Sequence, residues 1–182
     1  MGTPDRRASE RGQSIVEFAL ILPLLVFLMV AIVDLARIYT TMLSVESAAR
    51  EAADYGTFGS QKWDAAVYNI PVTGTEDQMR LRACTAASDL TDYAGPDTAC
   101  TNPTFSYLLS ADKGATWHAW DASMDCANET RNPPCWVKVT LNYDFHLLVP
   151  LHIEAFGMHL GLPNSLTFSR TSVFPMTDLE LP

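Results

Sequence analysis

The hydrophobic pattern of the chain is dominated by one long apolar run near its N-terminus. No charged residue occurs from Phe18 to Val33. The run extends back to Ile15 and then contains one acid, Glu17. A helix of about 19 residues is about 28 Å long, close to the hydrocarbon core of a bilayer at about 30 Å. The run is therefore predicted to span a membrane, and Glu17 is a candidate functional residue because a charge in hydrocarbon costs about 3 kcal/mol or more.

A secretory signal peptide is the alternative interpretation of this run. Signal peptides have an apolar region of about 7–15 residues, followed by a cleavage site of small residues. Here the apolar run is longer, and no A-x-A pattern follows it. The pattern therefore favours a membrane anchor over a cleaved signal.

Beyond Val33 the pattern becomes that of an amphipathic helix. Apolar residues recur at three- and four-residue steps: Leu35, Ile38, Met42, Val45, Ala49, Ala52 and Tyr55. Gly56 then supplies a stop signal. The sequence predicts one continuous helix from about Ser14 to Tyr55, and its second half packs either on its own domain or on a neighbouring helix.

Two pairs of opposite charges are spaced to interact along this helix. Asp34 and Arg37 are three residues apart at the outer end of the apolar run. Glu46 and Arg50 are four residues apart, in the order that favours an ion pair. Both pairs are predicted to form on the helix surface.

The rest of the chain predicts a small α+β domain. A second helix is expected at about 76–93, with Thr75 as its N-cap and Gly95-Pro96 ending it. Strands are expected at 105–109, 116–120, 136–147 and 166–174, and the third of these alternates most regularly between apolar and polar residues. The apolar stretch Leu147–Phe156 is interrupted by Pro150 and is too short for a second span, so it serves the core or a partner.

Charge and composition place these parts relative to a membrane. The formal net charge is -9, and nothing basic or clustered indicates nucleic acid as a partner. Arg6, Arg7 and Arg11 precede the run, which favours a cytoplasmic N-terminus in a single-pass protein of the cytoplasmic membrane. The predicted organisation is a cytoplasmic leader (1–12), a transmembrane and extended amphipathic helix (13–55) and an extracytoplasmic α+β domain (56–182).

The four cysteines agree with export of the domain. Cys84, Cys100, Cys126 and Cys135 all follow the apolar run, and an even number in an exported region is typical of disulfides. Three connectivities are possible, of which pairing Cys84 with Cys100 and Cys126 with Cys135 is the simplest. Structural zinc is the alternative, but the chain has no C-x-x-C motif.

Motifs of known enzymes are missing from the sequence. It has no G-x-S-x-G, Walker A, G-x-G-x-x-G or H-E-x-x-H pattern, and its four histidines are scattered. No catalytic residue, cofactor or metal site is therefore predicted, and the protein is expected not to be an enzyme.

The N-terminal segment resembles the prepilin segments of the type IV pilin class. A charged leader is followed by Gly12, Gln13 and the stretch SIVEFALILPLL. The closer resemblance is to the TadE-like family of pseudopilins in tight-adherence (Flp-type) pilus systems, and it covers roughly residues 11–55. It implies that a prepilin peptidase cuts between Gly12 and Gln13, which makes Glu17 the fifth residue of the mature chain.

The resemblance also implies a function in assembly. A pseudopilin of this type inserts beside pilin and other pseudopilin subunits, contacts membrane lipid and pilus platform proteins, and uses the acid equivalent to Glu17 for registration. The alternative for Glu17 is a partly hydrated acid at the membrane surface. Two other functions stay open for the whole chain: a membrane-anchored extracytoplasmic ligand-binding domain unrelated to pili, and an anchored hydrolase with an unusual site.

Overall fold

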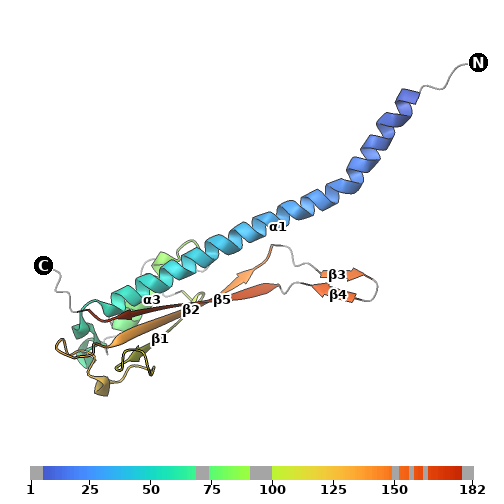
Figure 1. Ribbon diagram of the computed structural model, residues 1–182. Coiled ribbons are helices and arrows are strands. Elements are labelled where there is room, and N and C mark those ends of the chain that lie inside the picture. Colours follow the sequence, from blue (N-terminus) through green and yellow to red (C-terminus); the bar gives the residue numbers. More distant parts are fainter. Residues whose placement is uncertain are drawn as a thin grey trace, which may run out of the picture.

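The computed structural model describes residues 6–68, 74–90, 100–148, 152–155, 158–161 and 164–177. In these ranges the helices are α1 (Arg6–Thr57), α2 (Ala65–Tyr68) and α3 (Thr75–Ala86), with 3-10 turns η1 (Ser60–Trp63) and η2 (Ala122–Met124). The strands are β1 (Thr104–Ser110), β2 (Trp136–His146), β3 (His152–Ala155), β4 (Met158–Gly161) and β5 (Ser165–Pro175). The α+β class expected from the sequence is confirmed, and Figure 1 shows the domain lying along the C-terminal half of α1.

Helix α1 is continuous over 52 residues, as the run of apolar positions followed by an amphipathic pattern predicts. It begins at Arg6 rather than near Ser14, so it includes part of the segment expected to be a leader. Its axis bends in the N-terminal, blue part (Figure 1), which contains Pro23, the proline inside the helix. Proline removes one helical hydrogen bond and crowds the preceding turn, which accounts for a bend without a break.

Strand β2 is the centre of a three-stranded antiparallel sheet in the order β1-β2-β5. It pairs along its whole length with β5, whereas β1 pairs with it only from Trp136 to Asn142. Burial alternates along β2 as the sequence predicts. The buried face carries Val137, Val139, Leu141, Tyr143 and Phe145. This face is the one that packs against α1.

The strand predicted at 116–120 does not form. Only His118 makes a bridge there, to Leu109, through two backbone hydrogen bonds of 2.8 and 2.9 Å. The preceding turn explains the difference. Asp112 Oδ1 accepts a hydrogen bond from the backbone N–H of Thr116 (2.9 Å). This N–H is therefore bonded within the turn and is not available for pairing with a neighbouring strand.

Small side chains let α1 pack between α3 and the sheet (Figure 1). Ala48, Ala49, Ala52 and Ala53 are at most 1% exposed, and they bring the helix backbone close to its neighbours on both sides. The apolar face predicted for this helix is buried at Val45, Ala49 and Ala52, and Tyr55 is half-buried. At its start Leu35 is 66% exposed and Asp34 is buried, so the domain does not cover this end of the face.

Helix α3 differs from its prediction at both ends. Gly74 and not Thr75 is the N-cap residue, because the Thr75 hydroxyl donates to the backbone carbonyl of Lys62 instead. The helix ends at Ala86, earlier than the predicted residue 93. The Gly95-Pro96 stop signal lies outside the described residues.

Two disulfides fix the loops of the domain. Cys84 is bonded to Cys100, which ties α3 to the segment before β1, and Cys126 is bonded to Cys135, which closes a loop before β2. Cys84, Cys126 and Cys135 are almost fully buried. The part of the chain that the structure describes contains no free cysteine.

A separate two-stranded antiparallel sheet is formed by β3 and β4. It lies in the connection between the end of β2 and the start of β5. Figure 1 shows this hairpin extending beyond the main sheet, toward the N-terminal part of α1. Residues 149–151 and 156 of the predicted apolar stretch lie outside the described residues.

Candidate functional site: the N-terminal helix and its junction with the domain

The N-terminal half of α1 presents an apolar surface that the domain does not cover. Its residues from Ser14 to Met29 are all exposed, and Leu20 is 75% exposed. The part beginning at Ser14 is long and apolar enough to cross a membrane, and it is the one such helix in the described residues. The apolar surface therefore fits a lipid environment and not a soluble core.

Gly12, Gln13 and Glu17 follow one another along this helix. The backbone of Gly12 and Gln13 belongs to α1, and the structure describes no more than the backbone at these two residues. Glu17 lies four residues after Gln13, which is about one turn of helix, and its position on the helix is exposed. An acid and the predicted cleavage position thus share one end of the apolar segment.

Asp34 forms the junction between the apolar segment and the domain. It is the first charged residue after the run, and only 7% of its surface is exposed. Its Oδ1 accepts a hydrogen bond from Arg37 Nη1 (3.1 Å), so the predicted ion pair is confirmed. The same oxygen accepts from the backbone N–H of Leu148 (3.3 Å), just beyond β2.

Arg37 completes this junction by packing on the sheet. Its guanidinium lies 5.0 Å from the centre of the Phe145 ring, in the range of a cation–π interaction. Asp34 and Leu148 are 114 positions apart in the chain. Sequence spacing reveals the pair within the helix but carries no signal for this long-range contact.

Two further polar contacts hold α1 against α3 and the segment after it. Ser44 Oγ donates to Asp89 Oδ2 (2.7 Å). Arg82 Nη1 donates to Glu51 Oε1 (2.9 Å), and both side chains are nearly half exposed. Exposed pairs of this kind contribute little free energy. The buried alanines and the Asp34 junction therefore fix the helix more strongly than these pairs do.

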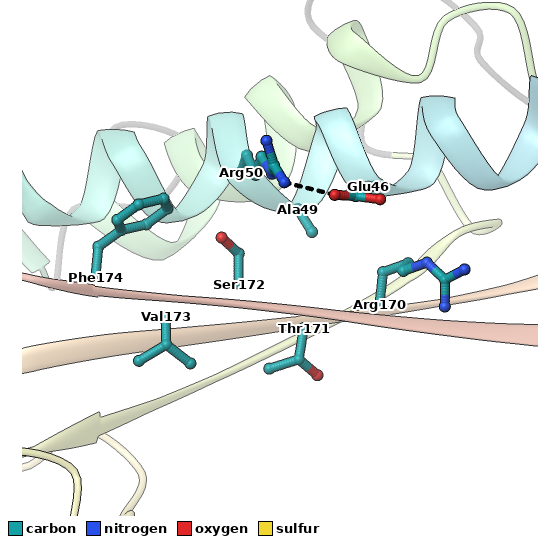
Figure 2. Close-up of a pocket in the computed structure, with 8 residues that line it drawn as sticks. All are labelled: Glu46, Ala49, Arg50, Arg170, Thr171, Ser172, Val173 and Phe174. Carbon is teal, nitrogen blue, oxygen red and sulfur yellow. Dashed lines mark hydrogen bonds and ion pairs between the residues drawn. The ribbon is translucent and has the colours of Figure 1, made fainter.

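A groove of about 510 Å³ lies between α1 and the edge strand β5. It is lined by Glu46, Ala49, Arg50, Arg170, Thr171, Ser172, Val173 and Phe174. Figure 2 shows the Glu46–Arg50 ion pair on the helix side of this groove. Its N–O distance is 2.6 Å, so the ion pair predicted from the four-residue spacing forms. The one acid among these residues is thus paired with arginine, and the lining offers no nucleophile–base pair.

The rest of the described domain is also poor in chemistry. No group of three or more His, Cys, Asp or Glu side chains that fits a metal ion occurs in the described residues. Burial, with a smaller effect of nearby Arg82, lowers the pKa of Lys62, but its amine donates to the Tyr55 carbonyl at the end of α1 (3.3 Å). This lysine supports the end of α1 through its contacts with Tyr55.

The turn after β1 contains a carboxylate, Asp112, that accepts several short hydrogen bonds. Ser110 Oγ donates to Asp112 Oδ1 (2.6 Å), and Thr116 Oγ1 donates to Oδ2 (2.6 Å). These bonds hold the pKa of Asp112 well below its ordinary value of 3.8. These hydrogen bonds close the turn after β1, so the role of Asp112 is structural.

This turn is expected to loosen in acid. A carboxylate whose folded-state pKa is depressed adds stability above its unfolded pKa, and this contribution is lost as the pH falls through the folded pKa. The amide of Thr116 should therefore lose protection from hydrogen exchange progressively below about pH 4. Asp112→Asn should show weaker protection of Thr116 at neutral pH and no such acid transition. An unchanged acid transition in that variant would contradict the assignment to Asp112.

A comparison with known protein families gives a match in the N-terminal helix α1. The model of the TadE-like protein family matches residues 12–54, which confirms the resemblance over the apolar segment and most of the amphipathic half of α1. The match fits a protein associated with a tight-adherence pilus. No curated protein and no solved structure gives a significant match to the chain.

Proposed function

We propose that this chain, whose residues 12–54 match the TadE-like model, is a minor pilin or pseudopilin that supports assembly of a tight-adherence (Flp-type) pilus. It is proposed to be non-enzymatic and to act through its N-terminal helix, placed beside pilin and other pseudopilin subunits. The observation that carries this proposal is the division of α1 into two surfaces. One surface is built into the domain, and the other is apolar and uncovered.

The uncovered apolar surface continues beyond the membrane-spanning segment. Leu35, Tyr39 and Leu43 are 66%, 63% and 49% exposed, and their four-residue spacing places them on one side of the helix. Further along the helix, from Val45 onward, the domain packs on Val45 and the buried alanines. A plain anchor needs apolar residues only within the bilayer. An apolar strip that extends outside it supports contact with the helices of neighbouring subunits.

Glu17 is the proposed registration residue. A cut between Gly12 and Gln13 by a prepilin peptidase creates an α-amino group one helical turn from Glu17. A carboxylate at lipid depth is costly when alone and is stabilised by a well-placed cation. Pairing of Glu17 with the Gln13 amine of an adjacent subunit would therefore favour one axial position between the two helices.

The proposed orientation follows from charge and cysteine chemistry. Arg6, Arg7 and Arg11 precede the apolar segment and favour a cytoplasmic N-terminus. The two disulfides of the domain are suited to an oxidising compartment outside the cytoplasm. The domain would then stand on the outer side of the cytoplasmic membrane, where it is placed to contact pilus platform proteins.

Deletion and complementation test this proposal. Removing the chain from its host is expected to reduce or abolish surface pili, counted by electron microscopy, and the full-length chain should restore them. A complementing variant with Tyr39→Asp and Leu43→Asp should restore less, because two charges interrupt the uncovered strip, whereas Lys138→Asp on the far face of the sheet should restore fully. Normal piliation in the deletion strain would overturn the proposal.

A further inference from the structure

The connection that contains the β3–β4 hairpin begins beside the residue of α1 where the apolar segment ends. The backbone N–H of Leu147 donates to the carbonyl of Asn164 (3.2 Å), which closes the base of the connection between β2 and β5. The next residue, Leu148, donates to Asp34, the first charged residue after the apolar run. From this base the hairpin extends toward the N-terminal part of α1 (Figure 1).

The direction of the chain supports this placement. The far end of β5 lies beside the C-terminal end of α1, where Thr177 exchanges backbone hydrogen bonds with Thr57 (3.0 Å) and Gly59 (3.4 Å). The near end of β5 and the end of β2 therefore lie toward the apolar segment. Strands β3 and β4 have four residues each and rise about 3.3 Å per residue, so the described part of the hairpin is about 13 Å long. One leaflet of hydrocarbon is about 15 Å thick, so the hairpin is long enough to enter it.

The register of the hairpin separates apolar from polar residues. Cross-strand partners in an antiparallel pair share a face of the ribbon, and successive residues alternate between faces. The pairs on one face are Ile153 with Leu160 and Ala155 with Met158. The pairs on the other face are His152 with Gly161 and Glu154 with His159. The backbone pairing thus makes a two-faced ribbon, with four apolar residues on one face.

Composition indicates that this ribbon requires an apolar surface. Of the 17 residues from Leu147 to Pro163, ten are apolar and one, Glu154, carries a formal charge. A two-stranded hairpin is marginally stable in water by itself. Its strands belong to a sheet separate from the three-stranded one. An apolar face on such a hairpin gains about 25 cal/mol for each Å² removed from water.

We propose that the β3–β4 hairpin inserts its apolar face into the bilayer leaflet on the domain's side of the membrane. Lipid is the occupant because the base of the hairpin lies at Asp34, where the apolar run ends, and the hairpin extends on the side of the domain from which the N-terminal part of α1 projects (Figure 1). The driving force is burial of apolar surface and not attraction to anionic headgroups, since the hairpin has no Lys or Arg. The hairpin and α1 then hold the domain at two points, which limits its tilt against the membrane. This proposal rests on insertion of α1 but not on the pilus function.

Site-directed spin labelling of the full-length chain in phosphatidylcholine vesicles tests this proposal. The four native cysteines are paired, so one added cysteine is the single free thiol. Separate labels are placed at Met158 and His159 of the hairpin, at Leu25 of the apolar segment, and at Ala115 of the distal turn. Oxygen concentrates in lipid and a nickel chelate stays in water, so the ratio of their collision rates reports depth. Near-UV circular dichroism equal to wild type shows that each labelled protein is folded.

The expected result is a graded depth. Leu25 should be oxygen-accessible and protected from nickel, Met158 should show the same preference at a shallower depth, and Ala115 should be nickel-accessible. His159, on the opposite face, should be shallower than Met158. Aqueous accessibility of Met158 beside a lipid-buried Leu25 would overturn the proposal, and so would protection of Met158 from both reagents, which indicates a protein contact. A Leu25 label outside lipid would overturn both this proposal and the anchor.

Discussion

Replacing Glu17 with alanine is expected to remove this subunit from assembled pili while leaving its level in the membrane unchanged. The apolar segment needs no acid to insert, and removing one lowers the cost of insertion by about 3 kcal/mol. Assembly, in contrast, should lose the carboxylate that we propose to pair with the Gln13 amine of a neighbouring subunit. The measurement compares the amount of the chain in sheared pili with the amount in membranes.

Two matched variants make this result specific. Glu17→Gln keeps the size and polarity of the side chain but removes its charge, so it should fail as Glu17→Ala does. Glu46→Ala removes an acid from the same helix outside the apolar segment, where its partner Arg50 is exposed, and should assemble normally. Normal incorporation of both Glu17 variants would show that Glu17 is a partly hydrated surface acid without a role in registration.

Replacing Asp34 with alanine is expected to lower the free energy of unfolding of the domain by about 1–3 kcal/mol. The change leaves the Leu148 N–H without its acceptor and removes the ion partner of Arg37. The Asp34 side chain is largely shielded from water, whereas the Arg37 side chain is 42% exposed. Urea unfolding of the chain in detergent micelles, followed by near-UV circular dichroism, measures the effect.

The Glu51–Arg82 pair supplies the control for Asp34. Glu51→Ala breaks an ion pair of similar length at the contact of α1 with α3, but both partners are nearly half exposed. Its expected cost is below about 1 kcal/mol. A double-mutant cycle of Asp34→Ala with Arg37→Ala separates the ion pair from the bond to Leu148. Equal effects of Asp34→Ala and Glu51→Ala would contradict a structural junction at Asp34.

Local patterns in the sequence predict the main elements well. The length of α1 follows from an apolar run joined to a helical repeat, and both depend on residues a few positions apart. The alternation from Val137 to Tyr143 predicts β2 for the same reason, because one face of a strand repeats every second residue. The Asp34–Arg37 and Glu46–Arg50 pairs need only the geometry of one helix.

Most differences from the predicted elements arise where a distant part of the chain decides the outcome. Leu35 fits the apolar repeat of α1 but is exposed, whereas its neighbour Asp34 is buried and accepts a hydrogen bond from the Leu148 amide. Thr75 has the residue type of an N-cap, but the carbonyl of Lys62 takes its hydroxyl. The strand expected at 116–120 gives way to the turn that Asp112 stabilises. The Asp34 and Thr75 contacts join separate parts of the chain, whereas the Asp112–Thr116 bond is local and competes with the pattern that predicted the strand.

The candidate site divides in the same way. Gly12, Gln13 and Glu17 are found from the sequence because they form a short linear pattern, and the family match begins at residue 12. The sequence shows an apolar stretch near Leu147 but does not place it. The fold places the base of the β3–β4 hairpin at the boundary of the apolar segment, and on this placement rests our proposal of a membrane contact, where the sequence left core and partner open.

The N-terminal residue of the mature protein, isolated from native membranes, tests the central claim most directly. Intact mass and sequencing of the terminal peptide identify it. The account predicts that the chain begins at Gln13, because cleavage after Gly12 creates the amine that pairs with Glu17. A chain that begins at Met1 or Gly2 would leave Glu17 without this partner, and a chain that begins at Asp34 or later would show that the apolar segment is a signal peptide. Either result would contradict the account.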